Sequence, residues 1–457
     1  MSPDQPASPA TYARRLGLFS GTMAVIGGII GGGIFRTPAT VAERVGSPGL
    51  ILGVWIAGGV VALVGALCFG ELGQRRPKAG GGYVYLRETW GPLAAFLYGW
   101  ALLLVIATGA MAAVAVTFAG YALALAGLPA RFTVPLAIGA IVFLSGVNWV
   151  GVRPGAVTQN VLTLLKLGAL AVLIIAGLAA LLSQAAPPAP PAPPAPAVPA
   201  VGERGIVLRL GSALVPILFT YGGWQQTNFL AEEMIEPEKS LPRALGLGVA
   251  VVVAVYLLAN VAYLGVLGPS GLAASSAPAA DTMRILFGPG GSTLIAAGIA
   301  VSTLGFLDLV ILVTPRVLQA MAADGVFLPR LARLHPVYRT PTAAIALLGA
   351  WAITLALTGT FAQLVDYVTF ADWTFFGLTV AGLFVYRARE RAAGTVAPGF
   401  RVPGYPWTPA LFVAAAAYVV VSSVLASLRN AAAGSVLLLL GVPVYRYWSG
   451  RSRRARA

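Results

Sequence analysis

Two interruptions of long apolar segments hold residue types that could bind a small polar ligand. One is the glycine cluster in the stretch AVIGGIIGGGIFRTP, residues 24–38. The other is the stretch TYGGWQQTN, residues 220–228, where glycines and polar side chains follow another apolar run. Each glycine costs a helix interior about 1 kcal/mol relative to alanine. The two stretches therefore predict breaks in two helices.

Unpaired backbone groups at such breaks define the chemistry that we expect. If the first helix stops near Ile29 and restarts after Gly33, the amides of residues 31–33 are unpaired donors at a helix N-terminus, which favours a carboxylate. The carbonyls that end the half-helices, around Ile29 and from Phe219 to Gly222, favour an ammonium. Together these groups would hold the backbone of an α-amino acid, and glycine would let that ligand approach the main chain.

The composition of the chain indicates whether these breaks belong to a soluble protein or to a membrane protein. The 457 residues are 58% hydrophobic and only 10% charged, and the mean hydropathy is +0.84. A soluble protein of this size cannot bury so much apolar surface, so we expect a membrane protein. The single cysteine, Cys68, and the single histidine, His335, exclude a disulfide framework and argue against a Cys/His metal site. We expect no metal and no cofactor.

Windows of about 20 apolar residues predict twelve membrane-spanning helices. An even number places both termini on one side. Of the 30 lysines and arginines, 22 fall on that side, seven fall on the other and Lys166 lies inside a span, so the positive-inside rule places both termini in the cytoplasm. The net charge of +15 is thus a sign of topology rather than of nucleic-acid binding. The predicted spans are approximately residues 17–41, 48–73, 90–122, 132–150, 157–183, 210–235, 241–268, 291–322, 342–359, 363–387, 408–428 and 432–449.

The two breaks fall in the first and sixth of these spans. Glycines four apart, such as Gly27 and Gly31, also suit close packing of two helices. Two interruptions at matching places in two halves of five spans are, however, typical of a transporter's binding site. Between the halves, the Pro-rich stretch at residues 184–200 predicts an extended polyproline strut on the outer side.

Three stretches resemble the amino acid–polyamine–organocation superfamily, most closely its L-type amino acid transporter branch and bacterial amino acid permeases. They are IIGGGIF (residues 29–35), GELGQRRPKAGGGYVYL (70–86) and FTYGGWQQTNFLAEEMIEPEKSLPRAL (219–245). The resemblance implies an all-α membrane protein with the leucine-transporter fold, in which two inverted repeats of five spans have unwound helices 1 and 6, and two peripheral helices follow. The implied segments are a cytoplasmic tail (1–16), the first repeat (17–183), an outer loop (184–209), the second repeat (210–387), a cytoplasmic loop (388–407), the last two spans (408–449) and a basic tail (450–457).

The resemblance also implies which residues contact a substrate. Gly32 and Gly33 would hold its carboxylate, and the carbonyls of Ile29, Phe219 and Gly222 would hold its amine. Many relatives have serine, alanine or threonine at the position of Gly32, and asparagine is frequent at positions 308 and 372, where this chain has aspartate. The full predicted set is Ile29, Gly31, Gly32, Gly33, Phe219, Tyr221, Gly222, Trp224, Gln225, Gln226, Phe370, Asp372 and Trp373.

Lys166 is expected to take part in coupling, because a charge within a span is costly unless it is paired. Several members of the superfamily have a lysine where sodium-coupled relatives bind sodium. The ammonium of Lys166 would bridge carbonyls near residues 25–28 and the hydroxyls of Ser302 and Thr303, either as a permanent substitute for an ion or as a proton carrier. Alternatively, it could extend to the cytoplasmic edge of the membrane.

Two aspartates within apolar spans leave alternatives open. Asp308 and Asp372 could accept hydrogen bonds from their neighbours or carry a proton. Asp372 could also line the pocket for the substrate's side chain with Phe370 and Trp373, where it would favour a cationic substrate. On the cytoplasmic side, the acidic residues that follow the second break would either pair with Arg75 or Arg76 in an inner gate or lie in solvent; they are Glu232, Glu233, Glu236 and Glu238.

Taken together, these features predict a secondary transporter in the inner cell membrane rather than an enzyme. We expect it to move small or medium neutral L-amino acids by alternating access, as an exchanger or coupled to protons and without sodium. A transporter of cationic amino acids or polyamines is the alternative within this class, and a membrane amino acid sensor is the alternative of another class. The expected partners are the substrate and the lipid bilayer, with no nucleic acid and no obligatory protein partner.

Overall fold

The described part of the chain is helical. The computed structural model describes residues 11–183, 203–359 and 361–456, and no strand occurs among them. The predicted strut at residues 184–200 lies outside the described residues, as do residues 1–10 of the N-terminal tail. The helices are α1 (Leu18–Ile29), η1 (Gly33–Phe35), α2 (Thr37–Val45), α3 (Pro48–Arg75), α4 (Gly82–Trp90), α5 (Pro92–Ala101), η2 (Leu102–Ile106), α6 (Ala107–Ala126), η3 (Ala130–Phe132), α7 (Thr133–Trp149), α8 (Val152–Leu182), α9 (Glu203–Thr220), η4 (Trp224–Glu233), α10 (Pro237–Ala274), α11 (Pro278–Phe287), α12 (Pro289–Val313), α13 (Pro315–Ala323), η5 (Pro329–Ala332), α14 (Thr342–Thr358), α15 (Phe361–Ala392), α16 (Trp407–Ala426), α17 (Leu428–Leu439) and α18 (Gly441–Arg456).

Many of these helices are suited to a bilayer. Within the described ranges, eight helical stretches are long and apolar enough to cross a membrane. Two further apolar helices, α1 and α14, are shorter. Helix α1 is short because it is only the first half of an interrupted segment. The chain is therefore a multi-pass membrane protein, as the composition predicts. The number of twelve spans remains a prediction.

Both predicted interruptions are present in the structure. The first segment is divided into α1, the short 3₁₀ helix η1 and α2, so the helix stops at Ile29 and resumes at Gly33. The second is divided into α9, which ends at Thr220, and η4, a 3₁₀ helix that begins at Trp224. The glycines thus mark unwound chain rather than only close helix packing.

The long third and eighth spans contain breaks that the sequence analysis did not anticipate. Between α5 and α6 the chain forms a π-helical turn, η2, in which the hydroxyl of Thr108 donates to the carbonyl of Leu103 over 2.7 Å. Such turns within α-helices are frequent at functional sites. The helix of the eighth span ends at Val313, and a new helix starts at Pro315, whose ring cannot continue the hydrogen-bonding pattern.

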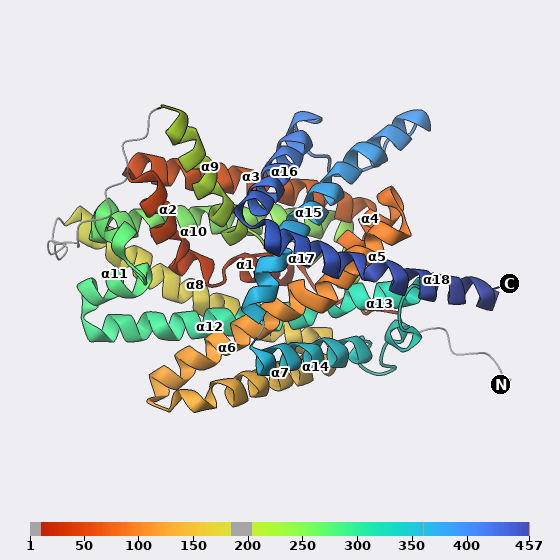
Figure 1. The fold of residues 1–457 in the computed structure, drawn as a ribbon, viewed down its shortest axis with the longest axis horizontal. Coiled ribbons are helices and arrows are strands. Elements are labelled where there is room, and N and C mark those ends of the chain that lie inside the picture. The colour runs from red at the N-terminus through yellow and green to blue at the C-terminus, as the bar shows by residue number, and fades with distance from the viewer. Residues whose placement is uncertain (1–10, 184–202, 360, 457) are drawn as a thin grey trace.

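The interrupted segments lie in the interior of the helix bundle. Helix α1 packs on α10, α8 and α12, and α10 also packs on α3 (Figure 1). Helices α7 and α14 pair at one edge of the molecule (Figure 1). In the most apolar stretches of α7, of α16 and of the chain from α17 into α18, less than a quarter of the residues are buried inside the protein. These outer helices therefore present their apolar side chains to lipid.

Candidate functional site

The two interruptions cross each other at a pair of glycines. Gly223 has a φ of +114°, and a Cβ atom at this position would lie 2.1 Å from the carbonyl oxygen of Gly28. Next to this crossing, Gly33 faces Thr220, whose Cγ2 would lie 2.7 Å from an added Cβ. The hydroxyls of Thr37 and Thr220 share a hydrogen bond of 2.8 Å. Glycine is therefore needed at position 223, because its main chain touches the main chain of Gly28 in the last turn of α1.

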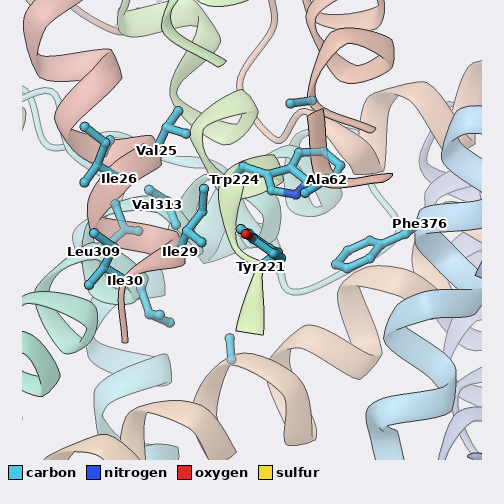
Figure 2. Packing of buried hydrophobic residues seen from close by; sticks show 14 of the residues in the cluster. Val25, Ile26, Ile29, Ile30, Ala62, Tyr221, Trp224, Leu309, Val313 and Phe376 are labelled. Atoms are coloured by element: carbon cyan, nitrogen blue, oxygen red, sulfur yellow. The ribbon is translucent and has the colours of Figure 1, made fainter. Parts of the chain in front are cut away.

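Aliphatic side chains hold the first interrupted segment against α12. Figure 2 shows Ile29 and Ile30 close to Leu309 and Val313, and all four side chains are buried. The apolar packing fixes where the unwound chain lies, because each buried aliphatic side chain is worth about 1.5–3 kcal/mol.

A cavity of about 310 Å³ lies beside the crossing. Its walls come from both interrupted segments and from α5, η2, α6, α12 and α15. The sequence analysis did not predict the part of the wall formed by Tyr98, Leu102 and Ile106. The π-helical turn η2 supplies two of these residues, Leu102 and Ile106. Ten of the thirteen predicted contact residues line the cavity, namely Ile29, Gly31, Gly32, Gly33, Phe219, Gly222, Gln225, Gln226, Asp372 and Trp373.

The other three predicted contact residues do not line this cavity. Tyr221 packs edge-on against Trp55, with 5.6 Å between ring centroids. Trp224 lies against Phe69, with 5.0 Å between ring centroids, and it is buried together with Tyr221. Phe370 packs in a small apolar cluster instead. These three rings therefore bury their apolar surface against other side chains between the helices.

Three consecutive amides at the first break are free. In the described part of the chain, the N–H groups of Gly32, Gly33 and Ile34 have no hydrogen-bond partner. The prediction placed the free donors at residues 31–33, but the amide of Gly31 donates to the carbonyl of Ile29 over 2.9 Å. That turn shifts the free donors by one residue, to the start of η1. Gly32 faces open space, with no atom within 4 Å of an added Cβ.

The carbonyls expected to bind an ammonium differ in the number of hydrogen bonds that they already accept. The Ile29 oxygen accepts from the Tyr256 hydroxyl over 3.0 Å as well as from Gly31, so its two lone pairs are used. The Phe219 oxygen accepts from the amide of Gly222 over 3.1 Å and keeps one lone pair. The Gly222 oxygen has no partner among the described residues. Ile29 lines the cavity, but its carbonyl would have to give up one of these two hydrogen bonds to accept from an ammonium, so its role stays a prediction.

Lys166 is fully buried and crosslinks three elements. Its ammonium donates to the carbonyls of Ile30 (2.9 Å) and Gly27 (3.1 Å) on the first interrupted segment and to the carbonyl of Ser302 (3.4 Å) on α12. The expected bridge to the unwound segment is present, whereas the expected bonds to hydroxyls are absent from the described contacts. The Ser302 hydroxyl donates to Ile30 (3.2 Å), and that of Thr303 bonds within its own helix. The ammonium does not extend to the membrane edge.

The two aspartates occupy different environments. Asp308 accepts from the amide of Asn148 over 2.8 Å and lies away from the cavity, and its second oxygen has no partner among the described residues. Asp372 lines the cavity and has no hydrogen-bond partner in the segments that the structure describes. It is the one carboxylate in the described cavity wall.

The acidic residues after the second break have other partners than expected. Glu233 forms a buried ion pair of 2.7 Å with Arg316, and Glu232 accepts from the amide of Ala79 over 3.1 Å. Arg75 pairs with Glu71 on its own helix and with Glu390 on α15, and Arg76 pairs with Glu88 on α4. The carbonyl of Glu233 also accepts a hydrogen bond from the amide of Leu16, so the N-terminal segment is bonded to the end of η4. Of the two alternatives, the pairing with Arg75 or Arg76 is absent from the described contacts, whereas Glu236 lies in solvent, where it is 67% exposed beside Lys239.

A multi-pass helical protein with two interrupted helices around a central cavity has the form of a membrane transporter. The sequence profile of one family, described as amino acid permease, matches residues 16–444. The chain therefore belongs to the amino acid permease family, as its sequence motifs predict.

Curated relatives cover most of the chain. It is 35% identical over 387 residues to the b(0,+)-type amino acid transporter 1 of Homo sapiens, an alignment of 84% of this chain and 78% of that protein. It is 31% identical over 435 residues to the serine/threonine exchanger SteT of Bacillus subtilis, covering 94% and 96%. It is 32% identical over 457 residues to the large neutral amino acids transporter small subunit 2 of Rattus norvegicus, covering 96% and 82%.

Proposed function

We propose that the protein is a secondary transporter that moves small or medium neutral L-amino acids across the membrane, as an exchanger or coupled to protons. One observation carries the proposal: the amides of Gly32, Gly33 and Ile34, which have no partner among the described residues, lie at the break that borders the cavity. Gly222, whose carbonyl also lacks a partner there, lines the same cavity. The relatives support it, since all three are named as transporters or an exchanger of amino acids. On the same ground we class the chain as a transporter rather than an enzyme.

The geometry suggests how a substrate would bind. Its carboxylate would accept hydrogen bonds from the amides of Gly32, Gly33 and Ile34 at the start of η1. Its ammonium would donate to the carbonyls of Gly222 and Phe219. Its side chain would then face the part of the cavity wall formed by Asp372, Trp373 and Phe376. Because this wall is mostly apolar and the cavity is small, we favour substrates with short side chains.

We further propose the leucine-transporter fold with twelve spans. Residues 17–183 and 210–387 would form its inverted repeats and residues 408–449 its peripheral helices, with both termini in the cytoplasm. In this arrangement the buried ammonium of Lys166 occupies the place of a coupling ion, so we expect transport without sodium. We propose no obligatory protein partner, although the name of one relative describes it as a small subunit.

The proposal is tested by uptake of labelled L-alanine and L-arginine into proteoliposomes that are empty or preloaded with unlabelled amino acid. Alanine uptake that needs preloading and ignores a proton gradient identifies an exchanger. Uptake into empty vesicles driven by an inward proton gradient identifies a symporter. Alanine binding without any uptake would contradict transport and indicate a sensor.

A second candidate, transport of cationic amino acids, is favoured by Asp372. A carboxylate in the cavity wall without a hydrogen-bond partner in the described part of the chain could pair with a cationic side chain. If arginine is a substrate, Asp372→Asn should raise its KM about tenfold or more and leave the KM of alanine within about twofold, because a charge-assisted bond is worth about 1.5–3 kcal/mol. The measurement is the KM of both substrates for both proteins. Equal changes for alanine and arginine would show that Asp372 does not select the side chain.

A further inference from the structure

A second cavity lies at the end of the molecule where α15 leaves the helix bundle. It measures about 210 Å³ and is bordered by the last two turns of α15 and by the loop that leads to α16. Three guanidinium groups line it, from Arg387, Arg391 and Arg401, together with the phenol of Tyr405. Glu390 is the one carboxylate in the described part of its wall.

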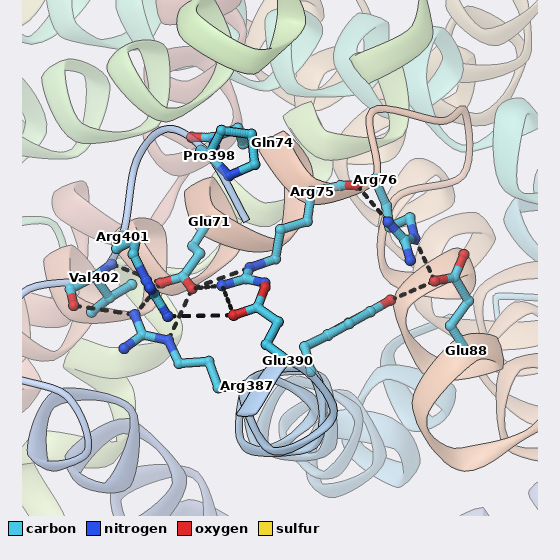
Figure 3. A network of polar contacts seen from close by, with 11 residues as sticks. Glu71, Gln74, Arg75, Arg76, Glu88, Arg387, Glu390, Pro398, Arg401 and Val402 are labelled. Atoms are coloured by element: carbon cyan, nitrogen blue, oxygen red, sulfur yellow. Dashed lines mark hydrogen bonds and ion pairs between the residues drawn. The ribbon is translucent and has the colours of Figure 1, made fainter. Parts of the chain in front are cut away.

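The arginines around this cavity outnumber the acids that neutralise them. Glu71 is shared by Arg75 and Arg387, and Glu390 is shared by Arg75 and Arg401 (Figure 3). Glu71 also accepts from the amide of Val402. The network therefore has three arginines for two carboxylates before Arg391 is counted.

Arg391 has no acidic partner in the described contacts. Its guanidinium donates to the hydroxyl of Tyr405 over 3.2 Å and lies 5.8 Å from the centre of that ring. Arg387 lies 4.0 Å from the same ring centre. The tyrosine thus holds two guanidinium groups beside one cavity, which leaves about two positive charges in excess. A planar guanidinium that is already positioned suits the oxygens of a phosphate group.

The surroundings of the cavity place it at the level of lipid headgroups. Trp407 begins the apolar helix α16 and is 80% exposed, and Val396 in the cavity wall is 70% exposed. Exposed tryptophan beside an apolar helix is typical of the membrane interface, and basic pockets at this level bind anionic headgroups. The proposed topology puts this end of the molecule on the cytoplasmic side.

We propose that this cavity binds a phosphate group through Arg391, Arg401 and Arg387, either on an anionic lipid headgroup or as the free anion. The negative charge of the phosphate would neutralise the excess positive charge that Glu71 and Glu390 leave on the arginines. Such a ligand would join the end of α15 to the loop before α16, which in this structure are connected through Arg401 and Glu390 over 3.3 Å.

The test is the thermal unfolding midpoint, Tm, of the full-length protein in neutral detergent during titration with dioleoylphosphatidylglycerol or with inorganic phosphate. Dioleoylphosphatidylcholine and sodium chloride at equal ionic strength are the controls. A ligand that binds the folded state raises Tm in a saturable manner. We expect Arg391→Gln to weaken the apparent affinity about tenfold, since it removes charge-assisted hydrogen bonds. Arg333→Gln removes another exposed arginine that does not line this cavity and should leave the affinity unchanged.

The two ligands distinguish the source of the phosphate. A response to phosphatidylglycerol without a response to inorganic phosphate supports a lipid site, and the reverse supports a site for the free anion. A wild-type response no larger than that to the control lipid and salt overturns the proposal, as do equal effects of the two substitutions. If Arg391→Gln does not fold, labelling of the wild type with phenylglyoxal decides the question. The ligand should then protect Arg391 and Arg401 but not Arg333, and the absence of such protection would reject the site.

Discussion

Replacing Lys166 by methionine should reduce the initial rate of amino acid exchange at least about 100-fold. Methionine fills a similar volume but cannot donate, so the carbonyls of Gly27, Ile30 and Ser302 would lose the ammonium that joins them. Because a hydrogen bond to a charged group is worth about 1.5–3 kcal/mol, the unwound segment should lose about 3 kcal/mol or more of its stability relative to α8 and α12. Exchange in proteoliposomes and Tm in detergent measure the two effects.

The matched control is Leu165→Ala on the same helix. The Leu165 side chain is 54% exposed, so its truncation should leave both exchange and Tm near the wild-type values. If Lys166→Met exchanges alanine at the wild-type rate, the ammonium is not needed to hold the break, and the proposed substitution for a coupling ion is wrong.

The position of the breaks could be predicted from the sequence, whereas the state of their hydrogen bonds could not. Five glycines within residues 27–33 make a continuous helix unfavourable, and the matching interruption in the sixth span indicates a break rather than close helix packing. Whether an amide there is free depends on the local turn. The bond from Gly31 to Ile29 moved the donors to Gly32, Gly33 and Ile34, and no residue type signals that bond.

Partners from distant segments explain the remaining differences. Tyr256 lies 227 positions from Ile29, and it occupies a carbonyl that sequence reasoning reserved for the substrate. Trp224 follows the break directly, which suggests a contact residue, yet Phe69 and Phe412 bury its ring away from the cavity. Motif spacing predicts which backbone segments approach one another. The direction of each aromatic side chain is decided by the helices packed around it, which one sequence does not reveal.

The buried charges show the same limit. Lys166 could be identified because an ammonium in an apolar span needs acceptors, and unwound carbonyls nearby are the natural ones. The pairing of Glu233 with Arg316 could not be read from the chain, since 83 positions separate them and Arg75 offered an equally plausible partner.

Gly223→Ala should abolish transport and lower Tm more than any other single methyl addition at the two breaks. The residue has a φ of +114°, which disfavours every side chain, and its new Cβ would lie 2.1 Å from the carbonyl oxygen of Gly28. The obstacle is main chain on both sides, so no flexible side chain can move away. The crossing of the interrupted segments would have to open, at a cost of about 4 kcal/mol or more, in the range of the most damaging substitutions. Tm and alanine exchange of the purified variant test this.

Gly32→Ala separates the effect of the crossing from a general need for glycine. Gly32 has a φ of −73°, which alanine adopts readily, and an added Cβ would meet no atom within 4 Å. The variant should therefore keep the wild-type Tm, and its free amide would still be available to a carboxylate. Since the methyl group would extend into space beside the cavity, we expect a higher KM for the larger substrates and little change for glycine. If Gly32→Ala and Gly223→Ala lower Tm equally, the close approach of Gly28 and Gly223 is not what makes glycine necessary, and the account of the crossing fails.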